Sequence, residues 1–161
     1  MTAKRPAFLT IMLIIALTAA SAALGALVSG GSDDPWYAAL TKPAFNPPDF
    51  VFGIVWPILF TLMVIGAVLV RLKAGSFNAA SSALGLYFTQ LAVGIAWSWL
   101  FFGFHQLLYA MVALVILWLL IVAMMRSFAR HSLAAAVLQL PYLAWISFAG
   151  VLNASLLILN Q

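Results

Sequence analysis

The sequence contains very little charge. Of its 161 residues, 6% are charged and 66% are hydrophobic, whereas about a quarter of the residues of an ordinary soluble domain are charged. Glutamate is absent, and the only acidic residues are Asp33, Asp34 and Asp49. A chain this apolar cannot cover its own surface with polar groups, so we expect it to be surrounded by lipid.

Several kinds of functional site are excluded by what is missing. Cysteine is absent, which rules out disulfides and thiolate metal sites. The remaining residues offer no His/carboxylate metal cluster and no Ser-His-Asp set. His105 and His131 are expected at opposite membrane faces, so they cannot hold a haem together. The basic residues are scattered, and the net charge of +4 therefore does not indicate nucleic-acid binding.

The chain does contain long apolar runs. Five of them, approximately 7–29, 50–70, 79–102, 107–126 and 133–158, have the length of a membrane span, since crossing the hydrocarbon takes about 20 residues. They lack the alternation of barrel strands. We therefore predict an all-α integral membrane bundle of five transmembrane helices, forming a single domain over 1–161. The first run could instead be a cleaved signal, but it is longer than a typical apolar signal region.

The charges between the runs predict an orientation. Six basic residues fall on one side of a five-span chain, and Lys42 falls on the other side together with all three Asp residues; the six are Lys4, Arg5, Arg71, Lys73, Arg126 and Arg130. The positive-inside rule then places the N-terminus inside and the C-terminus outside. We expect an integral protein of a bacterial cell membrane. No charged residue lies well inside a run, which argues against ion-coupled transport.

The segment 30–49 is the only connection with room for more than a turn. Asp33 or Asp34 can cap a short helix over WYAALT, with Pro35 in its first turn. The following KPAFNPPDF has three prolines, which fix the backbone and predict a stiff strap. Asp49 is expected to cap the second span. We interpret this segment as a lid.

Aromatic residues are expected to converge beneath that lid. Trp36, Tyr37, Trp56, Trp97 and Trp145 can all lie in the outer half of the bundle. Helix rise places Trp56 roughly 9 Å below the outer end of its span, too deep for an interfacial aromatic belt. The alternatives are packing between helices or lining a cavity.

The neighbouring residues complete the predicted ligand site. Phe52, Trp56 and Phe60 form one helical stripe, while Ala149 and Asn153 follow Trp145 by one and two turns. Pro57 and Pro141 are expected to loosen their helices beside the tryptophans. The predicted ligand-binding residues are Trp36, Tyr37, Phe52, Trp56, Phe60, Trp97, Trp145, Ala149 and Asn153.

Other intramembrane features suggest helix packing. Gln90, Gln139 and Asn153 are expected to bond between helices rather than to catalyse a reaction. Small residues repeat at a spacing of four in the first run (Ala16/Ala20, Ser21/Gly25) and in the third (Ala79/Ala83, Ser81/Gly85). Such spacing serves either the bundle or a homodimer, and we favour a dimer through the third run.

Four stretches resemble the TspO/MBR family of tryptophan-rich sensory and translocator proteins, also called peripheral benzodiazepine receptors. They are WYAALTKPAFNPPDFVFGIVW (36–56), QLAVGIAWSWLFF (90–102), LWLLI (117–121) and PYLAWISFAGVLN (141–153). The resemblance implies a five-helix bundle, often dimeric, that binds porphyrins such as protoporphyrin IX, haem or benzodiazepine-site drugs, with no obligatory cofactor. By position it assigns Tyr37, Trp56, Phe60, Trp97, Trp145 and Ala149 to the ligand site.

The sequence also departs from the family. Phe45 and Phe50 stand where tryptophan is frequent, and Gly94 stands where asparagine is usual. The sterol motif of animal members is absent, so we do not expect cholesterol binding.

Three functions remain open. The favoured one is a receptor or sensor for tetrapyrroles that regulates tetrapyrrole or stress responses. The second is a light-dependent porphyrin-degrading enzyme in which Trp56 takes part, because it matches a tryptophan implicated in that reaction in some bacterial members. The third is a porphyrin or lipid transporter.

Overall fold

The computed structural model describes residues 7–161, and all regular secondary structure in that range is helical. In chain order it contains α1 (Ala7–Ala26), η1 (Gly31–Asp33), α2 (Pro35–Ala39), α3 (Asp49–Lys73), α4 (Phe77–Ser98), η2 (Trp99–Gly103), α5 (Leu107–Ala129), α6 (Leu133–Val137) and α7 (Leu140–Leu159). Five stretches are long and apolar enough to cross a membrane. The predicted five-span all-α bundle is therefore confirmed. Lys4 and Arg5, used to predict the orientation, lie outside the described residues.

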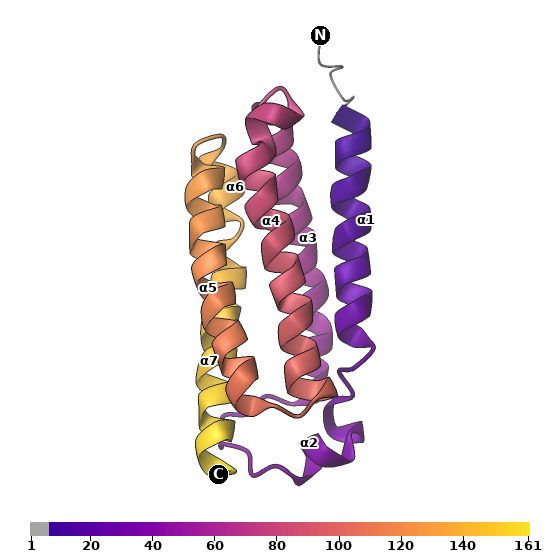
Figure 1. Ribbon diagram of the computed structural model, residues 1–161, viewed down its shortest axis with the longest axis vertical. Helices are drawn as coiled ribbons and strands as arrows, with labels where there is room; N and C mark the ends of the chain where they lie inside the picture. Colours follow the sequence, from indigo (N-terminus) through magenta and orange to yellow (C-terminus); the bar gives the residue numbers. More distant parts are fainter. Residues whose placement is uncertain (1–6) are drawn as a thin grey trace.

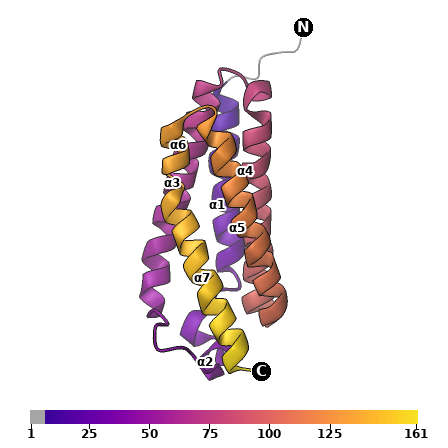
Figure 2. The ribbon, with the colours of Figure 1, turned by 90° about the vertical axis from the view of Figure 1, so that its left-hand side faces the viewer.

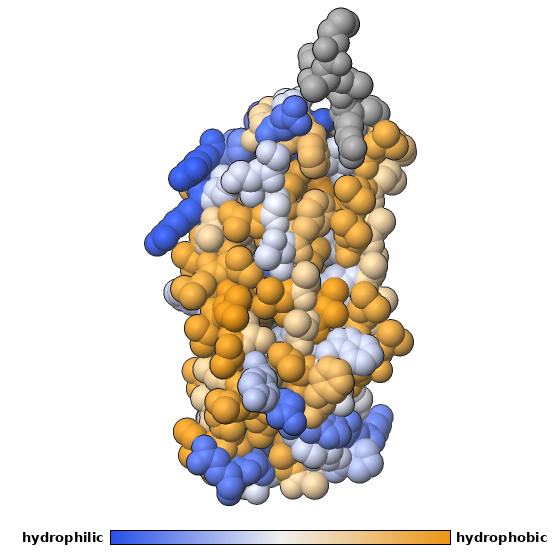
Figure 3. Space-filling model, viewed as in Figure 1, coloured by the Kyte–Doolittle hydropathy of each residue, from blue (hydrophilic) through white to orange (hydrophobic). Residues whose placement is uncertain are grey.

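The long helices run side by side along an elongated bundle (Figures 1 and 2). The short helix α2 and the strap lie at the end that carries the C-terminus. The loops that follow α3 and α5 lie at the opposite end, as five crossings require. On the face drawn in Figure 3, hydrophobic side chains cover the middle and hydrophilic ones gather at both ends. This distribution fits a protein whose central belt contacts lipid.

The last span is interrupted rather than only kinked. α6 ends at Val137 and α7 begins at Leu140, with Pro141 in its first turn. Proline cannot donate to the carbonyl four residues earlier, so the helix stops and restarts before it. Pro57, in contrast, lies inside a continuous α3. The two prolines predicted to loosen their helices thus have different effects.

Gln139 occupies the interruption and is fully buried. Its Nε2 donates to the Leu62 and Ala135 carbonyls, both at 3.3 Å. A Cβ on Gly66 would overlap this Nε2 and lie 3.1 Å from the Ala135 oxygen. Glycine at position 66 therefore allows α3 to approach α6 closely.

The other predicted interhelical polar contacts are also present. Tyr142 Oη donates to Gln90 Oε1 at 2.8 Å, joining α7 to α4. Asn153 Nδ2 donates to the Leu107 carbonyl at 3.0 Å, joining α7 to α5. The prediction that Gln90, Gln139 and Asn153 bond between helices is confirmed.

The small-residue repeats divide between two uses. Ser21 is buried, and a Cβ on Gly25 would lie 3.3 Å from Ser98 Oγ, so this repeat packs α1 against α4. Ala83 is fully buried and also serves the bundle. Ser81 and Gly85 on α4 are exposed to the surroundings. Ala16 and Ala20 on α1 are exposed as well, so one repeat on α1 and one on α4 are placed for a contact with a second copy.

Candidate functional site

A cavity lies between α3, α4 and α7 at the end that α2 covers. Its volume is about 30 Å³, and its walls are Tyr37, Phe52, Trp56, Trp97, Phe101, Phe102, Trp145, Ala149, Leu152, Asn153 and Leu156. No charged side chain is among these described lining residues. Its chemistry is that of an apolar, aromatic ligand site with a few polar atoms.

The structure brings seven of the nine predicted site residues to this cavity. Trp36 and Phe60 are not among the lining residues. Phe60 lies one turn deeper than Trp56 on α3, and its ring centroid is 5.5 Å from that of Trp56. It therefore supports the cavity wall from behind. Trp36 is adjacent to Tyr37 on a single helical turn, and so it faces a different direction.

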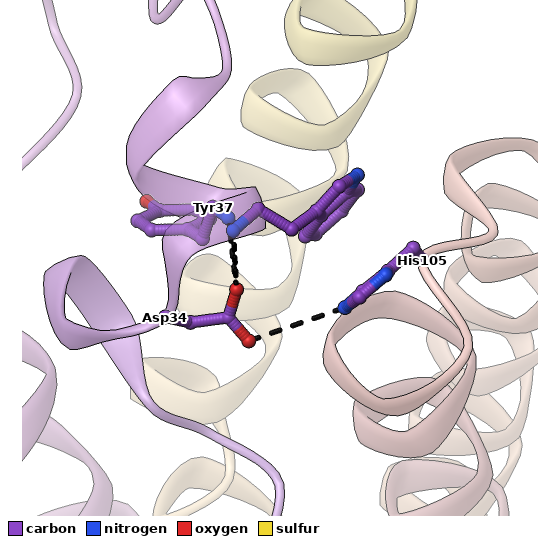
Figure 4. Close-up of polar contacts among 4 residues, drawn as sticks. Asp34, Tyr37 and His105 are labelled. Atoms are coloured by element: carbon purple, nitrogen blue, oxygen red, sulfur yellow. Dashed lines mark hydrogen bonds and ion pairs between the residues drawn. The ribbon is translucent and has the colours of Figure 1, made fainter.

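Asp34 builds the helix that covers the cavity. Its Oδ1 accepts from the backbone N–H groups of Trp36 at 2.8 Å and Tyr37 at 3.1 Å, an N-cap that satisfies two donors of the first turn (Figure 4). Pro35 occupies the first turn. The predicted short helix is confirmed, with Asp34 as its cap, although it ends at Ala39.

Tyr37 is the residue of α2 that faces the cavity. Its side chain is 4% exposed and its Oη donates to Asn46 Oδ1 of the strap at 3.3 Å. Burial raises the pKa of the Tyr37 phenol above its ordinary value, so the group stays neutral and keeps its proton for this bond. Lys42 Nζ donates to the Tyr37 carbonyl at 2.6 Å and lies 4.6 Å from the ring centroid. Tyr37 is thereby held by the strap on both sides.

Trp36 contacts the loop that follows η2. Its indole stacks on the His105 ring with centroids 4.2 Å apart and an angle of 12° between the planes. His105 Nε2 lies 4.0 Å from Asp34 Oδ2, as Figure 4 shows. His105 has a φ of 57°, a left-handed conformation that is rare outside glycine. This unusual backbone places the imidazole against the lid.

Phe101 and Phe102 line the cavity but were not predicted. They lie in η2, where the Phe104 N–H donates to the Trp99 carbonyl at 2.7 Å, a bond across five residues. This wider π-helical spacing brings both consecutive phenylalanines to the cavity that Trp97 lines. Such turns are frequent at functional sites. The phenylalanine pair itself was visible in the sequence, but the π turn that positions it was not.

The aromatic rings form two connected groups around the cavity. Trp56 contacts Trp97 and Tyr142, with centroid distances of 6.4 and 6.5 Å. On the other side, Trp145 contacts Phe52 at 5.6 Å and Phe148 at 5.4 Å. These edge and tilted contacts are the favoured geometries of aromatic pairs. They make both walls largely aromatic.

The strap and Thr41, the residue before it, contact the aromatic wall and the C-terminal end of α7. Phe45 packs against Phe148 with centroids 6.3 Å apart. Asn160 Oδ1 accepts from the Thr41 N–H at 2.8 Å, and Asn160 Nδ2 donates to the Thr41 carbonyl at 3.0 Å. These contacts join the lid to the last turn of the chain.

The predicted cap at Asp49 is wrong. Asp49 is the first residue of α3, and Pro48 precedes it without a side-chain cap. Asp49 Oδ2 instead accepts from the Ser32 N–H at 2.7 Å. Gly31 has a φ of 54°, and a Cβ there would lie 2.9 Å from Asp49 Oδ2. The carboxylate therefore ties the start of the lid segment to the start of α3.

Among the fully buried side-chain polar atoms of the lining residues, two lack a hydrogen-bond partner within residues 7–161. They are Trp97 Nε1, a donor, and Asn153 Oδ1, an acceptor. Trp97 is 9% exposed and Asn153 is 2% exposed. The lining of the cavity is thus largely apolar, and the residues that carry this unpaired donor and this unpaired acceptor both belong to it.

Comparison with known proteins agrees with this architecture. The sequence model of the TspO/MBR family matches residues 12–159. The chain is 38% identical over 152 residues to the tryptophan-rich protein TspO of Chlorobaculum tepidum, covering 94% of this chain and 96% of the relative. It is 37% identical over 146 residues to the tryptophan-rich sensory protein of Cereibacter sphaeroides, covering 91% and 88%. It is 39% identical over 131 residues to the translocator protein of Bos taurus, covering 81% and 78%.

The matched region contains four whole spans, the first span from residue 12 onward, the lid and every lining residue of the cavity. The similarity extends over most of each of these relatives, so it concerns the whole bundle and not one motif. The chain belongs to the TspO/MBR family.

Proposed function

We propose that this membrane protein is a receptor or sensor that binds tetrapyrroles, such as protoporphyrin IX or haem, and similar flat apolar ligands beneath α2. The observation that carries the proposal is the aromatic cavity between α3, α4 and α7, with Trp56, Trp97 and Trp145 in its walls. Flat apolar molecules gain most from such walls because both their faces can stack on rings. Family membership supports the same ligand class, including benzodiazepine-site drugs.

Ligand entry requires the cavity to open. Its volume of about 30 Å³ is far below the ~300–1,000 Å³ of typical ligand sites. The covering segment is held by small numbers of polar contacts and ring stacks near the surface. These are weaker than the apolar packing of the long helices. Opening is therefore expected to move α2 and the strap away from α7.

The proposed orientation places the lid outside the cell membrane and the loops after α3 and α5 inside. Arg71, Lys73, Arg126 and Arg130 are at the ends of those two helices, where the positive-inside rule puts basic residues. A membrane-impermeant label should react at a cysteine introduced at the C-terminus and not at one in the loop 74–76. Equal labelling of both sites would contradict this orientation.

We also propose a homodimer through α4. Ser81 and Gly85 lie exposed on that helix, and nothing lies within 4 Å of a Cβ placed on Gly85. Small exposed residues let two helices approach closely in lipid. Replacing Gly85 by leucine should shift the protein from dimer to monomer in mild detergent, as judged by light scattering. A dimer that survives this change would place the interface elsewhere.

Binding is tested by quenching of tryptophan fluorescence with protoporphyrin IX. The double variant Trp56→Ala, Trp145→Ala removes one ring from each wall. It should weaken binding by about 5- to 150-fold, since each lost ring contact contributes about 0.5–1.5 kcal/mol. Trp118→Ala is the matched control, because Trp118 is 39% exposed and is not a lining residue. Unchanged affinity of the double variant would remove this cavity as the site.

A light-dependent porphyrin-degrading activity is the second candidate. It is favoured by the position of Trp56, whose ring lies between Phe60, Trp97 and Tyr142 in the cavity wall. Illumination of the bound complex should then bleach the Soret band and form a new product. If Trp56→Phe bleaches the porphyrin at the same rate, Trp56 has no part in the reaction.

A further inference from the structure

The lining of the cavity includes one residue with an unpaired buried donor and one with an unpaired buried acceptor. Trp97 Nε1 can only donate a hydrogen bond, and it has no partner within residues 7–161. Asn153 Nδ2 donates to the Leu107 carbonyl at 3.0 Å. Because a carbonyl can only accept, this bond orients the amide and leaves Oδ1 as the free acceptor. Both residues are lining residues of the same cavity.

Buried polar groups in proteins almost always have partners, so each exception needs an explanation. Two of the exceptions in this protein, one donor and one acceptor, belong to residues that are more than nine-tenths buried and line one cavity. Gln90 and Tyr142, which lie deeper in the bundle, are bonded to each other. Gln139 Oε1 also lacks a partner within residues 7–161, but Gln139 is not a lining residue, whereas Trp97 and Asn153 line the same cavity.

We propose that Trp97 and Asn153 select ligands that carry one neutral group able both to accept and to donate a hydrogen bond. An amide, a lactam or a hydroxyl accepts from the indole N–H and donates to the amide oxygen. This inference rests on the proposed use of the cavity as a ligand site, and it adds the chemical class of the group that is buried there.

Other polar groups fit less well. An ester or a ketone accepts from Trp97 but leaves Asn153 Oδ1 unpaired. A carboxylate or an ammonium brings a charge into a cavity whose described walls hold no countercharge, and burial of an unpaired charge is strongly unfavourable. Ionised groups of a ligand are therefore excluded from this position and lie toward the lid.

The test uses three small probes with the same ring system. N-methyl-2-naphthamide accepts and donates, methyl 2-naphthoate is of similar size but only accepts, and 2-methylnaphthalene does neither. Affinities are measured by isothermal titration calorimetry with the full chain in lipid nanodiscs. The quantity compared is the ratio of the ester Kd to the amide Kd, because differences in water-to-lipid partitioning of the probes cancel between protein variants.

Replacing Asn153 by leucine should lower this ratio by about tenfold, because only the amide loses a bond. The affinity for 2-methylnaphthalene should stay within about threefold of the wild-type value, which checks that the cavity keeps its shape. A ratio that does not change in the folded variant would overturn the proposal.

Trp97→Phe is an independent test of the proposal, and it can be used even if Asn153→Leu does not fold. It removes the N–H, so amide and ester should weaken alike, by about tenfold relative to 2-methylnaphthalene. Equal effects on all three probes would contradict the assigned donor.

A protoporphyrin IX titration of the same samples distinguishes failure of this ligand selection from failure of the proposed function. If porphyrin binds and the probe ratios do not respond to either substitution, the selection rule fails while the proposed function stands. If the folded wild-type protein binds neither porphyrin nor any probe, both fail.

Discussion

Asn160 is expected to hold the lid closed. Its side chain makes two hydrogen bonds to the backbone of Thr41, at 2.8 and 3.0 Å, in the loop between α2 and the strap. A hydrogen bond of this kind contributes about 0.5–1.5 kcal/mol net, and this exposed pair belongs near the lower end. The variant Asn160→Ala should therefore favour the open lid by about 1–2 kcal/mol, which corresponds to roughly a 5- to 30-fold larger open population.

Hydrogen–deuterium exchange measures this opening without any ligand. The amides of residues 35–45 should exchange faster by that factor in Asn160→Ala, whereas amides in the middle of α5 should keep their rates. Asn78→Ala is the matched control, because Asn78 is an exposed asparagine at the start of α4, at the other end of the bundle. If exchange in 35–45 is the same as in the wild type, Asn160 does not fasten the lid and the reasoning is refuted. If lid opening limits ligand release, release of protoporphyrin IX should accelerate by a similar factor.

Two further predictions concern helix packing and the lid stack. Gly66→Ala places a Cβ on the Gln139 amide and should lower the free energy of unfolding by about 2–4 kcal/mol, through overpacking and lost buried hydrogen bonds. The control is Gly150→Ala, where the added Cβ meets nothing within 4 Å, and it should leave thermal unfolding in detergent nearly unchanged. Equal melting temperatures of the two variants would argue against the close approach of α3 and α6. His105→Asn removes the ring stacked on Trp36, and asparagine tolerates the left-handed backbone at this position. Hydrogen–deuterium exchange of the α2 amides should become about 2- to 10-fold faster, the factor expected for the loss of one aromatic pair. An unchanged exchange rate would show that the stack does not hold α2.

Composition and periodicity were sufficient for the bundle. The near absence of charge and the five apolar runs predict five helices, because lipid leaves the backbone no other partner than itself. Even the short helix over the cavity was readable, since Asp34 and Pro35 are local signals for a helix start. These predictions succeeded because each depends on residues close together in the sequence.

Where the structure differs from what local signals indicate, the contacts involve partners far away in the chain. Asp49 has the position of a helix cap, but its carboxylate bonds to Ser32, 17 residues earlier. Trp36 was predicted to bind ligand, and the structure places it outside the cavity lining. Its indole stacks on His105, which a left-handed backbone conformation brings to it. In both cases a local signal was outcompeted by a contact that exists only in the folded bundle.

The sequence alone therefore determined that this is a five-span membrane protein with tryptophans gathered beneath one stiff loop, because hydrophobic length, charge placement and helical spacing are local properties. Tertiary structure alone decided the size of the cavity, the entry of Phe101 and Phe102 through a π turn, and the clamp between Thr41 and Asn160. It also decided which polar atoms of Trp97 and Asn153 stay unpaired. These features depend on how side chains from distant segments pack together between the helices. Such contacts cannot be read from the order of residues along the chain.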